Sequence, residues 1–207
     1  MPVHDLMSIP VRDAGSGRLH VIVETPRGSR SKFKYEPLSG LFMLYKLLPL
    51  GAAFPYDFGF IPGTLEEDGD PLDVLVIGDE PTFVGCLLTV RVLGVIEANQ
   101  TEKGVTIRND RLVARPETRR IQPRERSLDD LPARSLNEIE HFFVSYNAAE
   151  NRKFEVIARR GPQVAERRIE ESVANFRSGK KKAPGGNGTG AAKSPRASRG
   201  RSKRAAR

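Results

Sequence analysis

Three carboxylates within six residues mark the stretch DGDPLDVLVI, which runs directly into an apolar strand. The acids are Asp68, Asp70 and Asp73. Like charges this close repel one another, and aspartate is a poor strand former. A hard divalent cation with oxygen ligands is the simplest way to hold three such carboxylates together. The alternative is an acidic surface turn in which water solvates each acid separately. Because the loop adjoins a core strand, the sequence favours the metal site over this alternative.

The residues between the acids indicate how one loop can aim them at one place. Strict strand alternation would put Asp73 on the opposite face from the other two acids. Gly69 permits a left-handed turn, and Pro71 sets a bend before the strand. We therefore expect a curled loop with converging carboxylates. It is not an EF-hand, because no matching loop with a twelfth-position glutamate follows.

Short β-rich segments separated by glycine and proline must position this loop. In the segment KFKYE, alternation places Lys32, Lys34 and Glu36 on one strand face. Apolar or alternating patterns predict extended segments at residues 18–25, 32–36, 41–49, 73–78, 85–97, 105–115 and 153–160. Apolar spacing of three and four predicts two helices, at residues 135–147 and 162–176. The pattern indicates a mainly β fold, an antiparallel β-barrel with two flanking helices, rather than a βαβ sheet.

The charge divides the 207 residues into a domain, residues 1–177, and a basic tail, residues 178–207. The tail holds 10 of the 34 lysines and arginines and none of the 26 acids, so the rest carries 24 − 26 = −2 charges. With so little apolar bulk, we expect the tail to be disordered. It is either an incidental extension or a weak, sequence-independent binder of polyanions.

Other features of the composition bear on location. No run of 18 or more apolar residues is present, so we expect no membrane-spanning helix. The first residues lack the pattern of a secretory signal. A single cysteine, Cys86, excludes an internal disulfide. These observations together predict a cytoplasmic protein.

The motif and its surroundings resemble the family I soluble inorganic pyrophosphatases. DGDPLDVLV is similar to the family signature, and FPYDFGFIPGT is similar to the segment that leads into it. VIVETPRGSRSKFKYE, RLVARP and HFFVSYN resemble further family segments, so the resemblance spans residues 18–177. It implies an OB-like barrel, Mg²⁺ dependence and hydrolysis of diphosphate to two phosphates. We also expect a homo-oligomer.

The resemblance also implies roles for individual residues. Asp68, Asp70 and Asp73 would bind the catalytic magnesium ions together with Glu24, and Asp70 would accept a proton from the attacking water. The expected substrate-binding residues are Lys34, Glu36, Lys46, Arg111 and Tyr146. Such cations are needed because diphosphate carries several negative charges that must be neutralised before water can attack.

Some positions depart from the family pattern. Phe58 stands where the family usually has a phosphate-contacting tyrosine, so a hydroxyl is missing. Lys46 replaces an arginine and loses its planar fork. Asn147 replaces a lysine and removes one positive charge.

Two family aspartates beyond Gly94 also appear as neutral residues here, Thr101 and Asn109. Asn109 stands two residues before Arg111, where the second of these aspartates belongs. Glu102 or Asp110 could fill the gap, although a one-residue slip turns a strand side chain to the other face unless a bulge intervenes.

The alternatives to a diphosphatase are a related phosphoanhydride hydrolase with another substrate, or a non-catalytic, OB-like nucleic-acid-binding module. The latter receives little support, since the chain has no tryptophan and residues 1–177 are slightly acidic.

Overall fold

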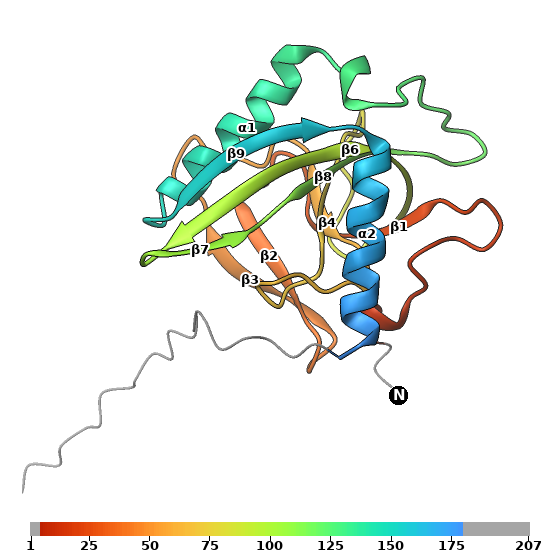
Figure 1. Cartoon of the computed structure of the whole chain (residues 1–207), viewed down its shortest axis with the longest axis horizontal. Coiled ribbons are helices and arrows are strands. Elements are labelled where there is room, and N and C mark those ends of the chain that lie inside the picture. Colours follow the sequence, from red (N-terminus) through yellow and green to blue (C-terminus); the bar gives the residue numbers. More distant parts are fainter. Residues whose placement is uncertain (1–4, 180–207) are drawn as a thin grey trace, which may run out of the picture.

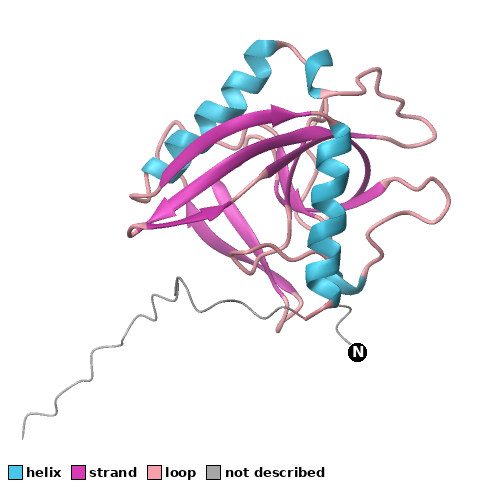
Figure 2. Cartoon of the chain, viewed as in Figure 1, coloured by secondary structure: helices cyan, strands magenta, loops and turns pink. Residues whose placement is uncertain are grey.

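The computed structural model describes residues 5–179, so almost all of the predicted basic tail lies outside the described residues. The strands are β1 (Leu19–Thr25), β2 (Ser31–Glu36), β3 (Leu41–Leu47), β4 (Asp57–Phe60), β5 (Asp73–Val76), β6 (Leu87–Glu102), β7 (Val105–Arg108), β8 (Arg111–Pro116) and β9 (Lys153–Arg160). The helices are α1 (Ala133–Ala148) and α2 (Pro162–Arg177), with short 3₁₀ turns at Leu6–Ser8 and Leu128–Asp130. The fold is mainly β with two helices at its periphery (Figure 2).

Seven strands form one sheet, in the order β1-β4-β5-β8-β6-β7, and β9 pairs with β6. A further pairing joins β6 to β1, so the hydrogen-bonded strands lead from β1 through β4, β5, β8 and β6 back to β1. The expectation that all pairs are antiparallel is wrong for one of them, because β5 and β8 run parallel. β2 and β3 form a separate hairpin, below the long β6 and β9 in the view of Figure 1.

The single strand expected at residues 105–115 is interrupted. β7 ends at Arg108 and β8 begins at Arg111, although both pair with the long β6. The β6–β7 hairpin turns through Lys103 and Gly104, which both have positive φ, 50° and 80°. Such two-residue turns match the twist of antiparallel strands. The break after Arg108 falls at Asn109, the position where the family pattern has an aspartate.

The central strands are buried on both faces. Leu75 and Val113 pack in a cluster with Ile139 and Phe143 of α1. The alternate residues of the same strands pack in a second cluster with Ala165 and Ile169 of α2. Strands that are buried on both faces have continuous apolar sequences. This explains why DVLVI follows the acidic loop without alternating polar residues.

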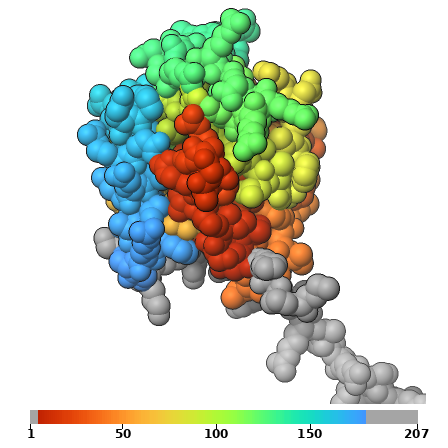
Figure 3. Space-filling model, turned by 90° about the vertical axis from the view of Figure 1, so that its right-hand side faces the viewer, coloured from red at the N-terminus to blue at the C-terminus, as the bar shows by residue number. Residues whose placement is uncertain are grey.

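The N-terminal segment packs against α2. It lies beside α2 in the space-filling view (Figure 3), and Arg12 forms an ion pair with Glu166 of that helix. Neither described helix has the length and apolar character needed to span a membrane.

Candidate active site

The acidic loop is a tight turn that leads into β5. Gly69 has a φ of 84°, the left-handed conformation that its lack of a Cβ permits. Gly69 N donates to Glu66 O (3.0 Å), and Asp70 N donates to the Asp68 side chain (Oδ1, 3.0 Å). The Asp68 carboxylate therefore lies against the backbone of Asp70, as a curled loop requires.

Lysine 34 connects this loop to the β2–β3 hairpin. Its Nζ lies 2.7 Å from Asp70 Oδ2. Lys34 shares a β2 face with Lys32, whereas Tyr35 on the opposite face stacks on Phe60. The predicted alternation of this strand is thus confirmed. Burial acts to lower the pKa of Lys34, but Asp70 outweighs it and the pKa is raised, so the amine is a cation near neutral pH.

Arginine 111 pairs with Asp73 because β5 and β8 are parallel neighbours. Val74 lies opposite Leu112, so the residues that precede them begin their strands side by side. Arg111 Nη1 is 2.8 Å from Asp73 Oδ2, and both side chains are largely buried. No spacing in the sequence predicts this contact, since it depends on a parallel pairing of distant segments.

Glutamate 24 adds a buried carboxylate at the end of β1. Its Oε1 accepts a hydrogen bond from Tyr35 N (2.8 Å). Burial raises the pKa of Glu24 to about 7, while the nearby Lys32 acts to lower it. The charge of Asp73 also raises the pKa of Glu24, which indicates that Glu24 belongs to the acidic cluster.

The acids of this cluster repel one another. Burial raises the pKa of Asp68 to about 6, and the charges of Asp70 and Asp73 add to the shift. Among residues 5–179, no three carboxylate, imidazole or thiol groups lie close enough to hold a metal ion as they stand. Lys34 and Arg111 instead hold two of the three acids. The three-carboxylate metal site therefore stays a prediction.

A group of cations and aromatic rings lies beside the cluster. Lys46 Nζ lies 3.7 Å from the centroid of the Tyr146 ring and pairs with Glu150. Lys32 Nζ lies 4.9 Å from the Phe58 centroid and 5.6 Å from the Tyr146 centroid. Sequence reasoning placed Lys32 on the Lys34 face but assigned it no role. Its position two residues before Lys34 was the available signal.

The structure does not bring Glu36 to this group. Its Oε1 accepts a hydrogen bond from Leu38 N (3.2 Å) in the turn of the hairpin. No contact joins it to the acids or cations of the site within the described part of the chain. Glu36 lies at the end of β2 next to the hairpin turn, away from the acids and cations of the site.

The residues around the missing aspartate separate onto two faces. Asn109 Oδ1 accepts a hydrogen bond from the Arg111 guanidinium, so Asn109 lies on the side of the acidic cluster. Asp110 is fully buried on the other side, where it pairs with Arg108 and with Arg168 of α2. Glu102 pairs with Arg152 (2.9 Å). Neither acid replaces the charge that Asn109 lacks.

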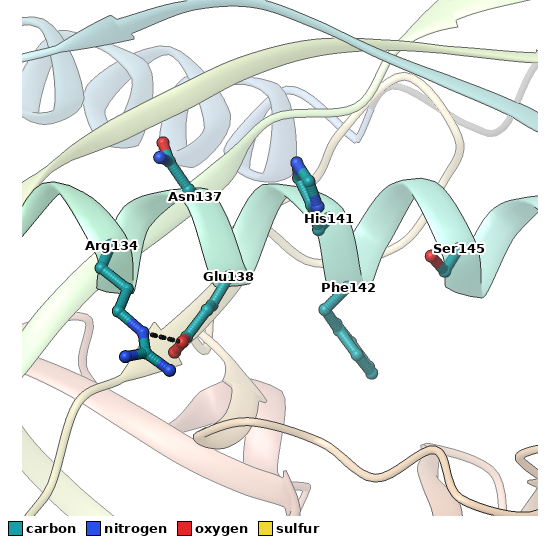
Figure 4. A pocket seen from close by; sticks show the side chains of 6 residues that line it. All are labelled: Arg134, Asn137, Glu138, His141, Phe142 and Ser145. Carbon is teal, nitrogen blue, oxygen red and sulfur yellow. Dashed lines mark hydrogen bonds and ion pairs between the residues drawn. The ribbon is translucent and has the colours of Figure 1, made fainter.

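A pocket away from the acidic cluster lies along α1. It has a volume of about 610 Å³ and is lined by Arg134, Asn137, Glu138, His141, Phe142 and Ser145. Figure 4 shows these side chains pointing to different sides of one helix, with a hydrogen-bonded Arg134–Glu138 pair. None of them belongs to the acidic cluster, so the pocket is not the candidate active site.

Comparisons with known proteins point to one family. The family model for inorganic pyrophosphatase matches residues 21–177. The inorganic pyrophosphatase of Synechocystis is 35% identical over 173 residues, which cover 84% of this chain and 99% of that protein. The Thermus thermophilus protein of the same name is 40% identical over 149 residues, covering 72% and 83% of the two chains.

Solved structures give the same result. The crystal structure of an inorganic pyrophosphatase from Thermus thermophilus matches with a TM-score of 0.75 and 32% identity. That match covers 84% of this chain and 99% of the other. A structure from Neisseria gonorrhoeae matches over the same shares, with a TM-score of 0.75 and 31% identity. The family match, residues 21–177, contains β5, β8, both helices and most of β1.

Proposed function

Because the chain belongs to the inorganic pyrophosphatase family, we propose that it hydrolyses inorganic diphosphate to two phosphates. The observation that best supports this is the alternation of acids and cations at one site, with Lys34 on Asp70 and Arg111 on Asp73. Diphosphate is a polyanion, and its hydrolysis needs positive charge on the phosphates and a group that takes a proton from water. The cluster contains both kinds of group.

We propose Mg²⁺ as the cofactor, held by Asp68, Asp70, Asp73 and Glu24. Carboxylate oxygens are the ligands that this ion prefers. The raised pKa values of Glu24 and Asp68, to about 7 and about 6, indicate negative charge that a cation would stabilise. When bound, Mg²⁺ supplies charge that neutralises the phosphates and lowers the pKa of a water molecule.

We propose roles for the chain's own residues that their positions support. Asp70 accepts a proton from the attacking water, since its carboxylate lies in the loop at the edge of the cluster. Lys34, Lys46 and Arg111 bind phosphate oxygens, and Tyr146 offers a hydroxyl beside Lys46. For Glu36, only its place on the β2 face supports a role in binding.

Phosphate release from diphosphate, with and without Mg²⁺, tests the function. Nucleoside triphosphates and organic diphosphates serve as competing substrates in the same assay. We expect release mainly from inorganic diphosphate and only with the divalent ion. Release from an organic phosphoanhydride alone would instead favour a related hydrolase whose pocket was reshaped at Phe58.

We further propose that the chain is a homo-oligomer. Strand β3 exposes large apolar side chains along its length, namely Leu41, Met43, Leu44, Tyr45 and Leu47. Exposed apolar side chains gathered on one strand in this way are typical of protein interfaces. Light scattering of the wild-type chain and of Leu44→Glu tests this, and a wild-type monomer would contradict it.

Three remaining proposals concern organisation. The circuit of pairings through β1, β4, β5, β8 and β6 supports an OB-like barrel as the framework. Residues 1–177 form the catalytic domain, and residues 178–207 are a separate basic extension. A cytoplasmic location fits the single cysteine of the chain.

A further inference from the structure

The acidic loop is joined to α2 through Glu66, which stands two residues before Asp68. The backbone of Glu66 closes the loop, because its N–H donates to Asp70 O (2.8 Å) and its carbonyl accepts from Gly69 N (3.0 Å). Its carboxylate forms an ion pair with Arg168 of α2. One residue therefore connects the closed loop to the helix.

The residue before Glu66 is held by the same helix. Leu65 N donates to Ser172 O (3.1 Å), and the Ser172 hydroxyl donates to Leu65 O (3.2 Å). Ser172 is fully buried. Because Arg168 and Ser172 are four residues apart, they lie on one face of α2, the face that meets the loop. Both backbone and side-chain contacts thus hold the start of the loop to α2.

The Glu66–Arg168 pair is more buried than the Lys34–Asp70 pair at the other end of the loop. The Glu66 side chain is 9% exposed and that of Arg168 is 21% exposed, whereas Lys34 and Asp70 are 39% and 43% exposed. Water weakens an exposed ion pair, while removal of one partner from a buried pair leaves a charge without a counterion. The contact with α2 is therefore the stronger of the two attachments of the loop.

Arginine 168 also contacts the start of β8. Its Nε lies 3.2 Å from Asp110 Oδ2, and Asp110 has a second partner in Arg108. Neutralising Asp110 therefore leaves the Glu66–Arg168 pair in place. The two contacts of Arg168 can thus be tested separately.

We propose that Glu66 and Arg168 are positioning residues, which hold the acidic loop in the conformation that binds Mg²⁺. The inference rests on the proposed metal site. The acids of the loop repel one another, so a metal-free loop that has lost its attachment to α2 is free to open. When only a fraction of the molecules has the competent loop, the apparent affinity for the ion falls by that fraction.

Amide hydrogen exchange of the metal-free chain tests the attachment itself. Relative to β6, residues 65–70 should exchange faster in Glu66→Ala and in Arg168→Met than in the wild type. Arg167→Met is the matched control, because Arg167 is an exposed neighbour on the same helix. Asp110→Asn is a second control, which loses stability but keeps the Glu66–Arg168 pair. Wild-type exchange of the loop in both Glu66→Ala and Arg168→Met would overturn the proposal.

Isothermal titration calorimetry with Mg²⁺ tests the consequence for the metal. Glu66→Ala and Arg168→Met should bind the ion about tenfold more weakly, as is typical when an outer partner of a metal site is removed. Arg168→Lys keeps the charge and should recover part of the affinity. The double variant should bind no more weakly than either single variant, because both residues act through one contact. In the hydrolysis assay, saturating Mg²⁺ should return kcat to near the wild-type value.

Each contrary outcome is distinct. Wild-type Mg²⁺ affinity in Glu66→Ala would reject the inference even if its melting temperature fell, and would leave the proposed function standing if the wild type hydrolyses diphosphate. Equal weakening in Asp110→Asn would show that lost stability, rather than a lost attachment, lowers the affinity. Failure of the wild-type chain to bind Mg²⁺ would overturn the proposed metal site and this inference with it. Glu66→Gln and Arg168→Gln, which keep more of each side chain, take the place of the first variants if those unfold.

Discussion

The ammonium of Lys34 lies 2.7 Å from the Asp70 carboxylate, across 36 positions of the chain. The pair joins the β2–β3 hairpin to the loop before β5. Both side chains are about two-fifths exposed, so the pair contributes little to stability, on the order of 1 kcal/mol or less. The pair matters for position, since it holds Lys34, a cation that we propose binds phosphate, next to the proposed proton acceptor Asp70.

Asp70→Asn should abolish most diphosphate hydrolysis while the fold remains stable. Loss of a proton acceptor slows such reactions by about 100-fold or more. The melting temperature should stay the same or rise, because one of three repelling acids is neutralised. Asp79→Asn is the control, as Asp79 is an exposed aspartate. Wild-type turnover in Asp70→Asn would exclude Asp70 as the base.

Stability of the metal-free protein should fall as the pH rises from about 4.5 to 7, the range over which folded Glu24 keeps a proton that the unfolded chain has released. This group contributes up to about 3 kcal/mol to the fall in the free energy of unfolding. Chemical denaturation with a chelator present measures the slope.

Glu24→Gln should flatten that slope, whereas Glu138→Gln, on the exposed side of α1, should leave it unchanged. An identical slope in Glu24→Gln and the wild type would show that Glu24 is ionised throughout the range.

Asn109→Asp should lower the Mg²⁺ concentration that diphosphate hydrolysis requires, by several-fold. Asn109 lies against Arg111 on the side of the acidic cluster, and an aspartate there would add a charged oxygen ligand. Activity measured over a range of free Mg²⁺ gives the requirement.

Glu102→Gln is the matched control, because Glu102 pairs with Arg152 and should not affect the metal. A higher Mg²⁺ requirement in Glu102→Gln, with no change in Asn109→Asp, would mean that Glu102 already fills the position.

Asp110→Asn should destabilise the fold by about 2 kcal/mol, because it removes the buried charge that pairs with Arg108 and Arg168, although both arginines keep another acidic partner. Urea denaturation measures the loss. The activity of the folded fraction and its Mg²⁺ requirement should be unchanged, since Asp110 lies on the α2 side of β8. An altered Mg²⁺ requirement at constant stability would contradict this placement.

Deleting residues 180–207 should leave the melting temperature and diphosphate hydrolysis nearly unchanged and remove any affinity for nucleic acid. In the full chain, that affinity should fall steeply with salt, because lysine and arginine bind phosphates by releasing counterions. Gel-shift titration with single-stranded DNA at several salt concentrations tests both statements. Binding that persists after the deletion would favour a nucleic-acid-binding role for the domain.

Some features of this protein are determined by local sequence. The β2 alternation alone places Lys32, Lys34 and Tyr35 on their faces, because side chains alternate along any strand. Gly69 and Pro71 specify the curled acidic loop in the same local way. The apolar run after Asp73 correctly predicted a core strand, although it did not say that two helices cover its two faces.

Other features depend on which distant strands become neighbours. The parallel pairing of β5 with β8 puts Arg111 beside Asp73, and the sequence reading had expected an antiparallel arrangement throughout. The same pairing turns Asp110 toward α2 and leaves Asn109 beside the acids. The fold also places the Lys32 ammonium over Phe58, a contact that the strand pattern alone does not predict. Local sequence specifies which face a side chain takes, but packing of distant segments decides what that face meets.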